Sequence, residues 1–333
     1  MKPELAIPPF QAAWYAPGGH LQTIVGNYLR RDCPAPQLKP LVVPLADGDA
    51  IVLHVGEPEG CLPDDKRPMA LLMHGLGGTH KSAYVLRAAV KLMQIGYRVA
   101  AIDHRGCGVG LSHAKRVTHA GRWQDIDAAV QFLRERYLPS KLVLVGYSLS
   151  GNMVLKWGAE TASHSADGTA IMSVCPPVDL MECSEWIERR RSWAYNQSFC
   201  KNLIQTVERR RKERPDAYHI DLPRRPKTLR EFDSLFTAPL GGFSSVEEYY
   251  SSSSSAPNLE KIAAPTLILA AADDPIVPIR PLEKAKLSES TQLVITPGGG
   301  HLGYLTSARN DPDRRWMDWR VVDFVKSVAP LSV

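Results

Sequence analysis

Residues 141–154 read Lys-Leu-Val-Leu-Val-Gly-Tyr-Ser-Leu-Ser-Gly-Asn-Met-Val, and this stretch decides the fold. It opens as an apolar run of strand length, turns sharply at residues 146–149, and continues with residues that suit a helix. A serine between a buried strand and the N-terminus of a helix has the geometry of a nucleophile elbow. The stretch therefore predicts that Ser148 attacks an acyl carbonyl, although an ordinary turn with a helix-capping serine has the same local pattern.

The last position of the elbow differs from the usual motif G-x-S-x-G, because the chain carries Ser150 there. Glycine at that position lets the helix approach the strand closely and permits an unusual backbone angle. Serine is the next smallest polar residue, and Gly151 follows at once. The substitution weakens the motif without excluding it.

Length and composition predict a folded protein. The chain has 333 residues, of which 44% are hydrophobic and 23% charged, which fits one large α/β domain with an insertion, or two domains. Residues 1–10 lack a basic region followed by an apolar run, so no secretory signal is expected. No stretch approaches the roughly 20 apolar residues of a membrane span. The net charge of +5 is mild and by itself argues neither for nor against nucleic acid. We expect no nucleic-acid partner.

The cysteines indicate a reducing compartment. None of them forms a C-x-x-C pair, and they are scattered over positions 33, 61, 107, 175, 183 and 200. This pattern suits free thiols better than a disulfide framework or a zinc site. We therefore expect a cytoplasmic protein.

Short apolar strands alternate with helices along most of the chain. Helices are expected at residues 82–94, 123–137 and 316–328, and strands in the elbow and at residues 41–45, 50–55, 69–73, 99–102, 169–174, 265–270 and 292–296. Repeated β–loop–α units predict a mostly parallel, doubly wound sheet with its site beyond the carboxyl ends of the strands. Residues 1–40 are rich in proline, and we expect them to be irregular and packed on the core.

The β–α rhythm breaks after residue 176. Residues 177–260 carry no apolar strand, several runs of arginine, a helical pattern at 185–212 and a serine run at 251–255 that is expected to be a loop. We interpret this region as a cap inserted between two parts of the core, residues 41–176 and 261–333. A basic arm for RNA or acidic lipid is the alternative, but the interspersed glutamates favour a solvated helix face with local ion pairs.

A nucleophilic serine needs a base, an acid that orients the base, and donors for the oxyanion. His301 follows three glycines after the last strand, and Asp274 follows the preceding strand, with Asp273 as its competitor. The order Ser148, Asp274, His301 is the chain order of α/β-hydrolases. These three residues are therefore the expected catalytic set.

The oxyanion donors are expected from two backbone positions. The N–H group of Leu149 directly follows the nucleophile, and Leu76 lies in the loop after the strand at 69–73. That loop nearly matches a phosphate loop, but His80 stands where glycine is required. His113 and His119 have no accompanying ligand cluster, so we expect solvated loop histidines and no metal site.

Further motifs resemble the YheT-like family of α/β-hydrolases almost from end to end. They are Gly19-His20-Leu21-Gln22-Thr23-Ile24, His74-Gly75-Leu76, Asp103-His104-Arg105-Gly106-Cys107-Gly108 and, in the expected cap, Phe232-Asp233 with Thr237-Ala238-Pro239. The resemblance implies an α/β-hydrolase fold and a charge relay at Ser148, Asp274 and His301. It also implies a carboxylesterase for short or medium acyl chains, with relatives that act on phospholipids or transfer acyl groups to alcohols.

We therefore expect a serine carboxylesterase that needs no cofactor and acts on a small-molecule ester or a lipid. An acyltransferase or a phospholipase using the same serine is the first alternative. A non-catalytic protein that binds acyl ligands or a membrane surface is the alternative from another class, kept open by Ser150 and the basic cap. A weak association with a membrane surface also stays open.

Overall fold

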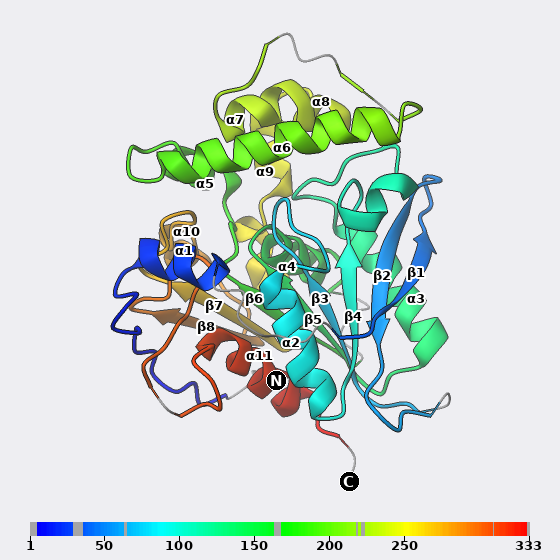
Figure 1. Cartoon of the computed structure of the whole chain (residues 1–333), viewed down its shortest axis with the longest axis vertical. Helices are drawn as coiled ribbons and strands as arrows, with labels where there is room; N and C mark the ends of the chain where they lie inside the picture. Colours follow the sequence, from blue (N-terminus) through cyan, green and yellow to red (C-terminus); the bar gives the residue numbers. More distant parts are fainter. Residues whose placement is uncertain are drawn as a thin grey trace.

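A computed structural model describes residues 5–28, 36–62, 65–162, 168–217, 219–220, 224–308 and 310–331. In this part of the chain eight strands form one sheet, in the order β1-β2-β4-β3-β5-β6-β7-β8 (Figure 1). The strands are β1 (Lys39–Pro44), β2 (Ala50–Gly56), β3 (Met69–Met73), β4 (Arg98–Asp103), β5 (Leu142–Tyr147), β6 (Thr169–Val174), β7 (Thr266–Ala271) and β8 (Thr291–Thr296). Only the pairs β1–β2 and β2–β4 are antiparallel, so the predicted mostly parallel, doubly wound sheet is confirmed.

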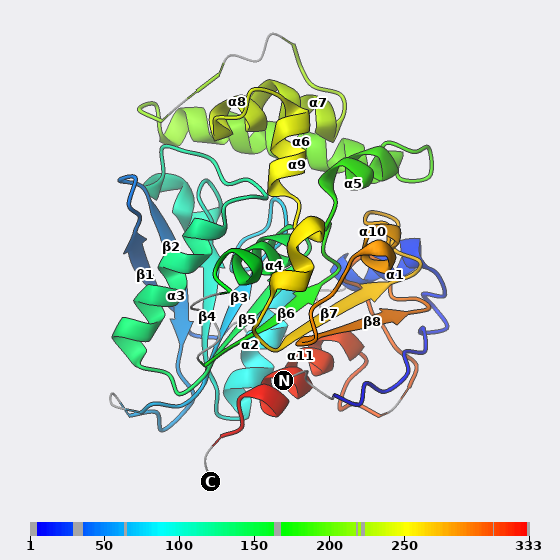
Figure 2. The same ribbon diagram turned by 180° about the vertical axis from the view of Figure 1, so that it is seen from behind.

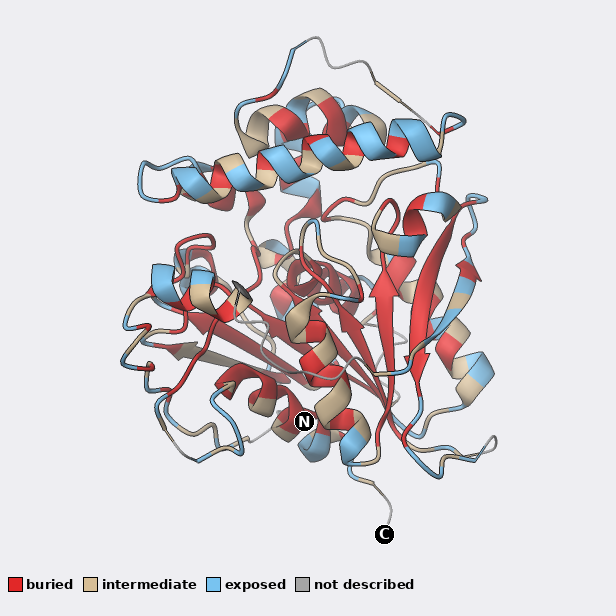
Figure 3. Cartoon of the chain, in the orientation of Figure 1, coloured by how far each residue is buried: buried red, intermediate tan, exposed pale blue. Residues whose placement is uncertain are grey.

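Two helical layers cover the faces of the sheet. Helices α2 (Ala83–Gln94) and α11 (Trp316–Val328) pack on one face, and α3 (Trp123–Tyr137) and α4 (Leu149–Glu160) pack on the other (Figures 1 and 2). Successive side chains of a strand point to opposite faces of the sheet. Leu72 of β3 packs in the core with α2 and α11, and Leu71 packs in the core with α3 and α4. The central strands are buried along their whole length, as Figure 3 shows. Their apolar composition without alternation reflects this burial on both faces.

The amino-terminal segment contains a helix that the sequence did not predict. Residues expected to be irregular form α1 (Gly19–Tyr28). Tertiary hydrogen bonds hold the first turns, because the Gln22 side chain donates to the carbonyl oxygens of Ala16 and Leu305, at 2.7 and 3.0 Å. The proline-rich composition of residues 1–40 gave no sign of these contacts.

A layer of helices lies above the carboxyl edge of the sheet (Figures 1 and 2). We call these the cap helices: α5 (Leu180–Ile187), α6 (Trp193–Glu213), α7 (Leu229–Phe232), α8 (Ala238–Gly241) and α9 (Val246–Ser253), with the π-helical turn η2 (Asp233–Thr237) between α7 and α8. The outer face of α6 is exposed (Figure 3), and an ion pair joins Arg209 to Glu213 on it at 2.6 Å. The boundaries at residues 177 and 260 stay a prediction.

Of two expectations for the cap region, one was right in part and the other was wrong in part. The region 185–212 is mostly helical as expected, but it divides into α5 and α6 with a turn between them, where Ser192 donates its hydroxyl hydrogen to the carbonyl oxygen of Pro275 at 2.6 Å. Part of the serine run at 251–255 is helical and completes α9. The Ser252 hydroxyl donates back to the carbonyl oxygen of Glu248 at 2.7 Å, a local bond that serine can form within a helix.

No described helix is both long and apolar enough to span a lipid bilayer. Cys33 and the first four residues of the segment inspected for a signal lie outside the described residues.

Candidate active site

Ser148 occupies a strained turn between β5 and α4. Its backbone angles are φ +53° and ψ −118°, a region that residues other than glycine rarely adopt. Such strain persists only where the surrounding structure enforces it. Gly146 makes the turn sterically feasible, because a Cβ atom there would lie 2.3 Å from the carbonyl oxygen of Ser150. The turn leaves the Ser148 side chain half-buried at the carboxyl edge of the sheet.

The imidazole of His301 lies between Ser148 and Asp274. Its Nε2 atom is 2.9 Å from Oγ of Ser148, and its Nδ1 atom is 2.7 Å from Oδ2 of Asp274. Oδ1 of Asp274 accepts hydrogen bonds from the N–H groups of Ile276 and Val277, at 2.7 and 2.9 Å. A neutral imidazole that donates Nδ1–H to the carboxylate leaves Nε2 free to accept the serine proton. The structure therefore brings together the three side chains that the sequence singled out.

Asp273 has a different set of contacts from its neighbour Asp274. Oδ1 of Asp273 accepts a hydrogen bond from the N–H group of Gly300 at 2.8 Å. Burial raises the pKa of the Asp273 carboxyl. The two adjacent aspartates are thus distinguished: Asp274 contacts the imidazole, and Asp273 contacts the backbone of the glycine loop.

Two residues of α1 hold the loop that carries His301, and sequence reasoning missed their role. Oγ1 of Thr23 accepts a hydrogen bond from the N–H group of His301 at 2.8 Å. Oε1 of Gln22 accepts one from the N–H group of Leu305 at 2.6 Å. Gly300 permits this close approach at φ +57°, since a Cβ atom there would lie 2.3 Å from the carbonyl oxygen of Gly19. The specific motif at residues 19–24 was the available signal.

The expected oxyanion donors flank Ser148. Leu149 is the first residue of α4, where N–H groups have no partner within the helix. Leu76 lies in the loop after β3, and a Cβ atom on Gly75 in that loop would lie 3.0 Å from Cβ of Ser148. Leu76, Leu149 and Ser148 line the same cavity. The assignment of their N–H groups as donors stays a prediction.

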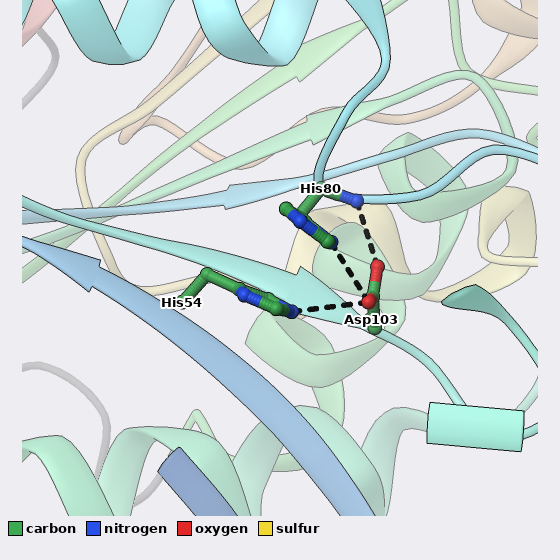
Figure 4. Close-up of side chains that lie close together, drawn as sticks. All are labelled: His54, His80 and Asp103. Atoms are coloured by element: carbon green, nitrogen blue, oxygen red, sulfur yellow. Dashed lines mark hydrogen bonds and ion pairs between the residues drawn. The ribbon is translucent and has the colours of Figure 1, made fainter. Parts of the chain in front are cut away.

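Asp103, at the end of β4, anchors the far side of the same loop (Figure 4). Its Oδ1 atom accepts from the N–H group of His80 at 2.7 Å, and its Oδ2 atom contacts Nδ1 of His80 and Nε2 of His54, at 2.8 and 3.0 Å. Burial opposes the carboxylate charge, but the hydrogen bonds from His54 and His80 outweigh it and hold the pKa of Asp103 far below its usual range. His80, which breaks the phosphate-loop pattern, is thus an anchoring residue.

Two groups of side chains among the described residues have the composition of a metal site. In the first, His54, His80 and Asp103, the two rings are stacked with centroids 3.4 Å apart, and both face the carboxylate (Figure 4). Stacked rings direct their nitrogens nearly parallel, whereas ligands of a tetrahedral ion diverge. In the second group, Cys175, Asp274 and His301, the imidazole already contacts the hydroxyl of Ser148. Burial also raises the pKa of the Cys175 thiol. Hydrogen bonds account for both groups.

A cavity of about 260 Å³ separates Ser148 from the cap helices. Most of its lining from the cap is apolar and includes Leu180, Ile187, Phe199, Leu203, Phe232 and Phe236. Asp233 is one of several polar residues that the cap also contributes, and its Oδ2 atom accepts a hydrogen bond from the Tyr250 hydroxyl at 2.8 Å. Burial raises the pKa of Asp233 to about 6. The cavity therefore suits an apolar group and has a buried carboxyl group in its wall.

His119 is not the solvated loop histidine that the sequence suggested. It lines the cavity and is buried between the rings of Phe243 and Tyr249, with centroids 5.1 and 5.8 Å away. Burial lowers the pKa of His119 to about 3. The aromatic cage comes from the cap, which sequence spacing alone could not bring to residue 119. His113 is half-buried.

Comparisons with known proteins place this arrangement in a family. A family model described as the alpha/beta hydrolase fold matches residues 70–308. The chain is 30% identical over 312 residues to protein abhd-3.2 of Caenorhabditis elegans, with coverage of 92% of this chain and 82% of that protein. It is 28% identical to YheT of Escherichia coli, covering 92% of this chain and 89% of YheT, and 28% identical to phospholipase ABHD3 of Homo sapiens, covering 86% and 71%.

Solved structures show the same fold at low sequence identity. The 2,6-dihydroxy-pseudo-oxynicotine hydrolase aligns with a TM-score of 0.57 at 18% identity, over 91% of this chain and 71% of that one. The esterase Pf2001 of Pyrococcus furiosus aligns with a TM-score of 0.57 at 14% identity, over 97% and 98%. The family model establishes that the chain belongs to the alpha/beta hydrolase fold family, and the similarity to YheT makes it YheT-like within that family.

Proposed function

We propose that this chain is a serine esterase that cleaves carboxylic esters through an acyl-enzyme. One observation carries the proposal: a single imidazole lies 2.9 Å from a serine hydroxyl and 2.7 Å from a buried carboxylate. A base within hydrogen-bond reach of a nucleophile, oriented by a third group, is the arrangement of activated nucleophiles. The strained backbone of Ser148 supports the same function, because strain of this kind concentrates at active sites.

Acylation begins when Oγ of Ser148 attacks the ester carbonyl and its proton passes to Nε2 of His301. Asp274 holds the ring through Nδ1–H and stabilises the imidazolium that forms. The N–H groups of Leu149 and Leu76 receive the negative oxygen, each contributing roughly 3 to 4 kcal/mol to the transition state. Collapse of the tetrahedral intermediate breaks the ester C–O bond, and the alcohol leaves with the proton from Nε2.

Deacylation repeats these steps with water in place of the serine. His301 takes a proton from the water as its oxygen attacks the acyl carbonyl. The second tetrahedral intermediate expels Oγ of Ser148, which recovers its proton from Nε2. The products are the carboxylic acid and the free enzyme, so the reaction needs no cofactor.

The apolar lining of the cavity supports an acyl chain as the group bound beneath the cap helices. We propose short or medium acyl chains. Lipid esters are a second candidate, since relatives carry the names phospholipase ABHD3 and monoacylglycerol lipase. The five cysteines in the described residues are free thiols, which supports a reducing cytoplasm as the location.

The replacement Ser148→Ala tests this function most simply. Hydrolysis of p-nitrophenyl butyrate should fall to the background rate, because the variant lacks the hydroxyl that contacts Nε2 of His301. The same assay over acyl lengths from acetate to decanoate, and on monoacylglycerols and phospholipids, identifies the preferred ester. Undiminished turnover by the alanine variant would refute the proposal.

A further inference from the structure

Ser150 replaces the last glycine of the usual elbow motif, and its hydroxyl is completely buried. Its Oγ atom donates to the carbonyl oxygen of His74 at 2.5 Å and lies 2.8 Å from Nε2 of His104. A hydroxyl has one hydrogen to donate, so Nε2 of His104 carries the hydrogen of the second bond. Burial holds the pKa of His104 well below its ordinary value, which keeps that ring neutral.

The bond from Ser150 to the carbonyl oxygen of His74 connects the segments that carry both expected oxyanion donors. Ser150 is the second residue of α4, directly after Leu149. His74 begins the loop that continues through Gly75 to Leu76. One buried hydroxyl therefore joins the elbow to the oxyanion loop.

The oxyanion loop needs such an anchor because it is rich in glycine at positions 75, 77 and 78. Asp103 fixes its far end through the N–H group of His80. The Tyr84 hydroxyl accepts from the N–H group of Gly75 at 2.9 Å. The contact from Ser150 differs from these because it comes from the nucleophile's own helix.

We propose that Ser150 is a positioning residue that sets the spacing between the N–H groups of Leu76 and Leu149. This inference rests on the proposed esterase function. Serine in place of the motif's glycine then adds a contact to the elbow and does not impair it. Glycine at this position would provide neither bond, and it would leave His104 without the partner of its Nε2 atom.

The effect should appear in the transition state and not in the bound substrate, because the donors act on the charge that develops during attack. Loss of one complete oxyanion donor typically costs 10²- to 10³-fold in kcat. A displaced loop loses only part of the stabilisation that one donor provides. Ser150→Ala and Ser150→Gly should therefore each lower kcat by about tenfold or more. KM should stay within about twofold, because the acyl pocket is unchanged.

A trifluoromethyl ketone separates positioning from a general structural role. It adds to Ser148 and places a negative oxygen in the oxyanion hole, so its inhibition constant should rise by the same factor as kcat falls. Ser173→Ala is the matched control: this serine is also fully buried, but its hydroxyl donates to the Gly151 carbonyl oxygen of α4 at 3.0 Å and not to the loop. The control should retain wild-type kcat and inhibitor affinity.

The outcomes separate this inference from the proposed function. If Ser148→Ala is inactive while both Ser150 variants keep wild-type kcat and inhibitor affinity, the positioning role is wrong and the esterase function stands. A higher kcat in Ser150→Gly would also overturn it. If the wild-type protein hydrolyses no ester and binds no ketone, the esterase function itself fails. Thermal melts identify a variant that does not fold. If Ser150→Ala does not fold, the test rests on Ser150→Gly, because glycine is the usual residue of the motif.

Discussion

The carboxyl edge of the sheet and the cap helices use opposite means to hold their residues. At the edge, hydrogen bonds fix each polar side chain: Asp274 accepts two backbone N–H groups, and His301 is held at its backbone and at both ring nitrogens. In the cap, apolar contacts dominate, and Asp233 is buried there with a shifted pKa, as is His119 of the core where it packs against cap residues. The difference teaches that the edge fixes the geometry of the catalytic side chains, whereas the cap sets the volume and the polarity of the cavity.

The largest expected effect tests whether the edge depends on one particular aspartate. Asp274→Asn should lower kcat by about 10³- to 10⁴-fold, because the amide no longer stabilises the imidazolium or its tautomer. Asp273→Asn is the matched control. It should change kcat by less than about tenfold, since an amide oxygen can still accept from Gly300. Equal losses in the two variants, measured on p-nitrophenyl butyrate, would contradict the assigned geometry.

A smaller loss should follow when the support behind the imidazole is removed. Thr23→Val takes away the acceptor of the His301 N–H group while keeping a β-branched side chain of similar size. We expect kcat to fall by about ten- to a hundredfold through misplacement of the base. Thr23→Ser keeps the hydroxyl and should stay close to wild type. A valine variant with full activity would show that the motif at residues 19–24 acts elsewhere.

In the cap, a change of volume should alter substrate choice without stopping the chemistry. Leu203→Ala enlarges the cavity lining and should shift the preferred acyl chain to greater length. Each methylene accommodated is worth about 0.8 kcal/mol, or roughly fourfold in kcat/KM. Leu138→Ala, at an exposed position outside the cavity lining, is the control and should leave the profile unchanged. If Leu203→Ala kept the wild-type preference for acyl-chain length, the cavity would not determine substrate specificity.

The smallest expected effect is a dependence of stability on pH. Asp233 binds its proton more tightly in the folded protein than in the unfolded chain, because burial raises its pKa to about 6. Its stabilising contribution is therefore complete below about pH 4 and is lost as pH rises through about 6, up to about 3 kcal/mol. His119 acts with the opposite sign, since its lowered pKa costs stability as pH falls.

The variant Asp233→Asn isolates this group. Its Tm should fall less than the wild-type Tm between pH 4 and pH 7, because the contribution of His119 is common to both proteins. Thermal melts at several pH values measure the difference. Parallel curves for the two proteins would show that the Asp233 carboxyl is not shifted.

The sequence predicted the edge better than the cap, for physical reasons. Helices α3 and α11 have the expected bounds, because apolar periodicity reports packing on a sheet. Ser148, Asp274 and His301 could be selected because parallel strands end at one edge. The sequence could not show which of Asp273 and Asp274 contacts the imidazole, since that depends on the direction of each side chain in a turn.

Residues that act across long separations could not be predicted. Thr23 contacts His301 across 278 positions, and the hydroxyl of Ser150 reaches the His74 carbonyl oxygen across 76. His119 was misjudged because aromatic side chains from the cap surround it. Local pattern carries no information on such contacts, which exist only after the chain is folded.

Covalent labelling tests the central claim most directly. A fluorophosphonate probe should add to Oγ of Ser148, and fragment-ion mass spectrometry should place the adduct there and not on Ser150, two positions later. The account predicts full labelling of the wild-type protein and none of Ser148→Ala. An adduct on another residue, or no adduct on the folded wild-type protein, would contradict it.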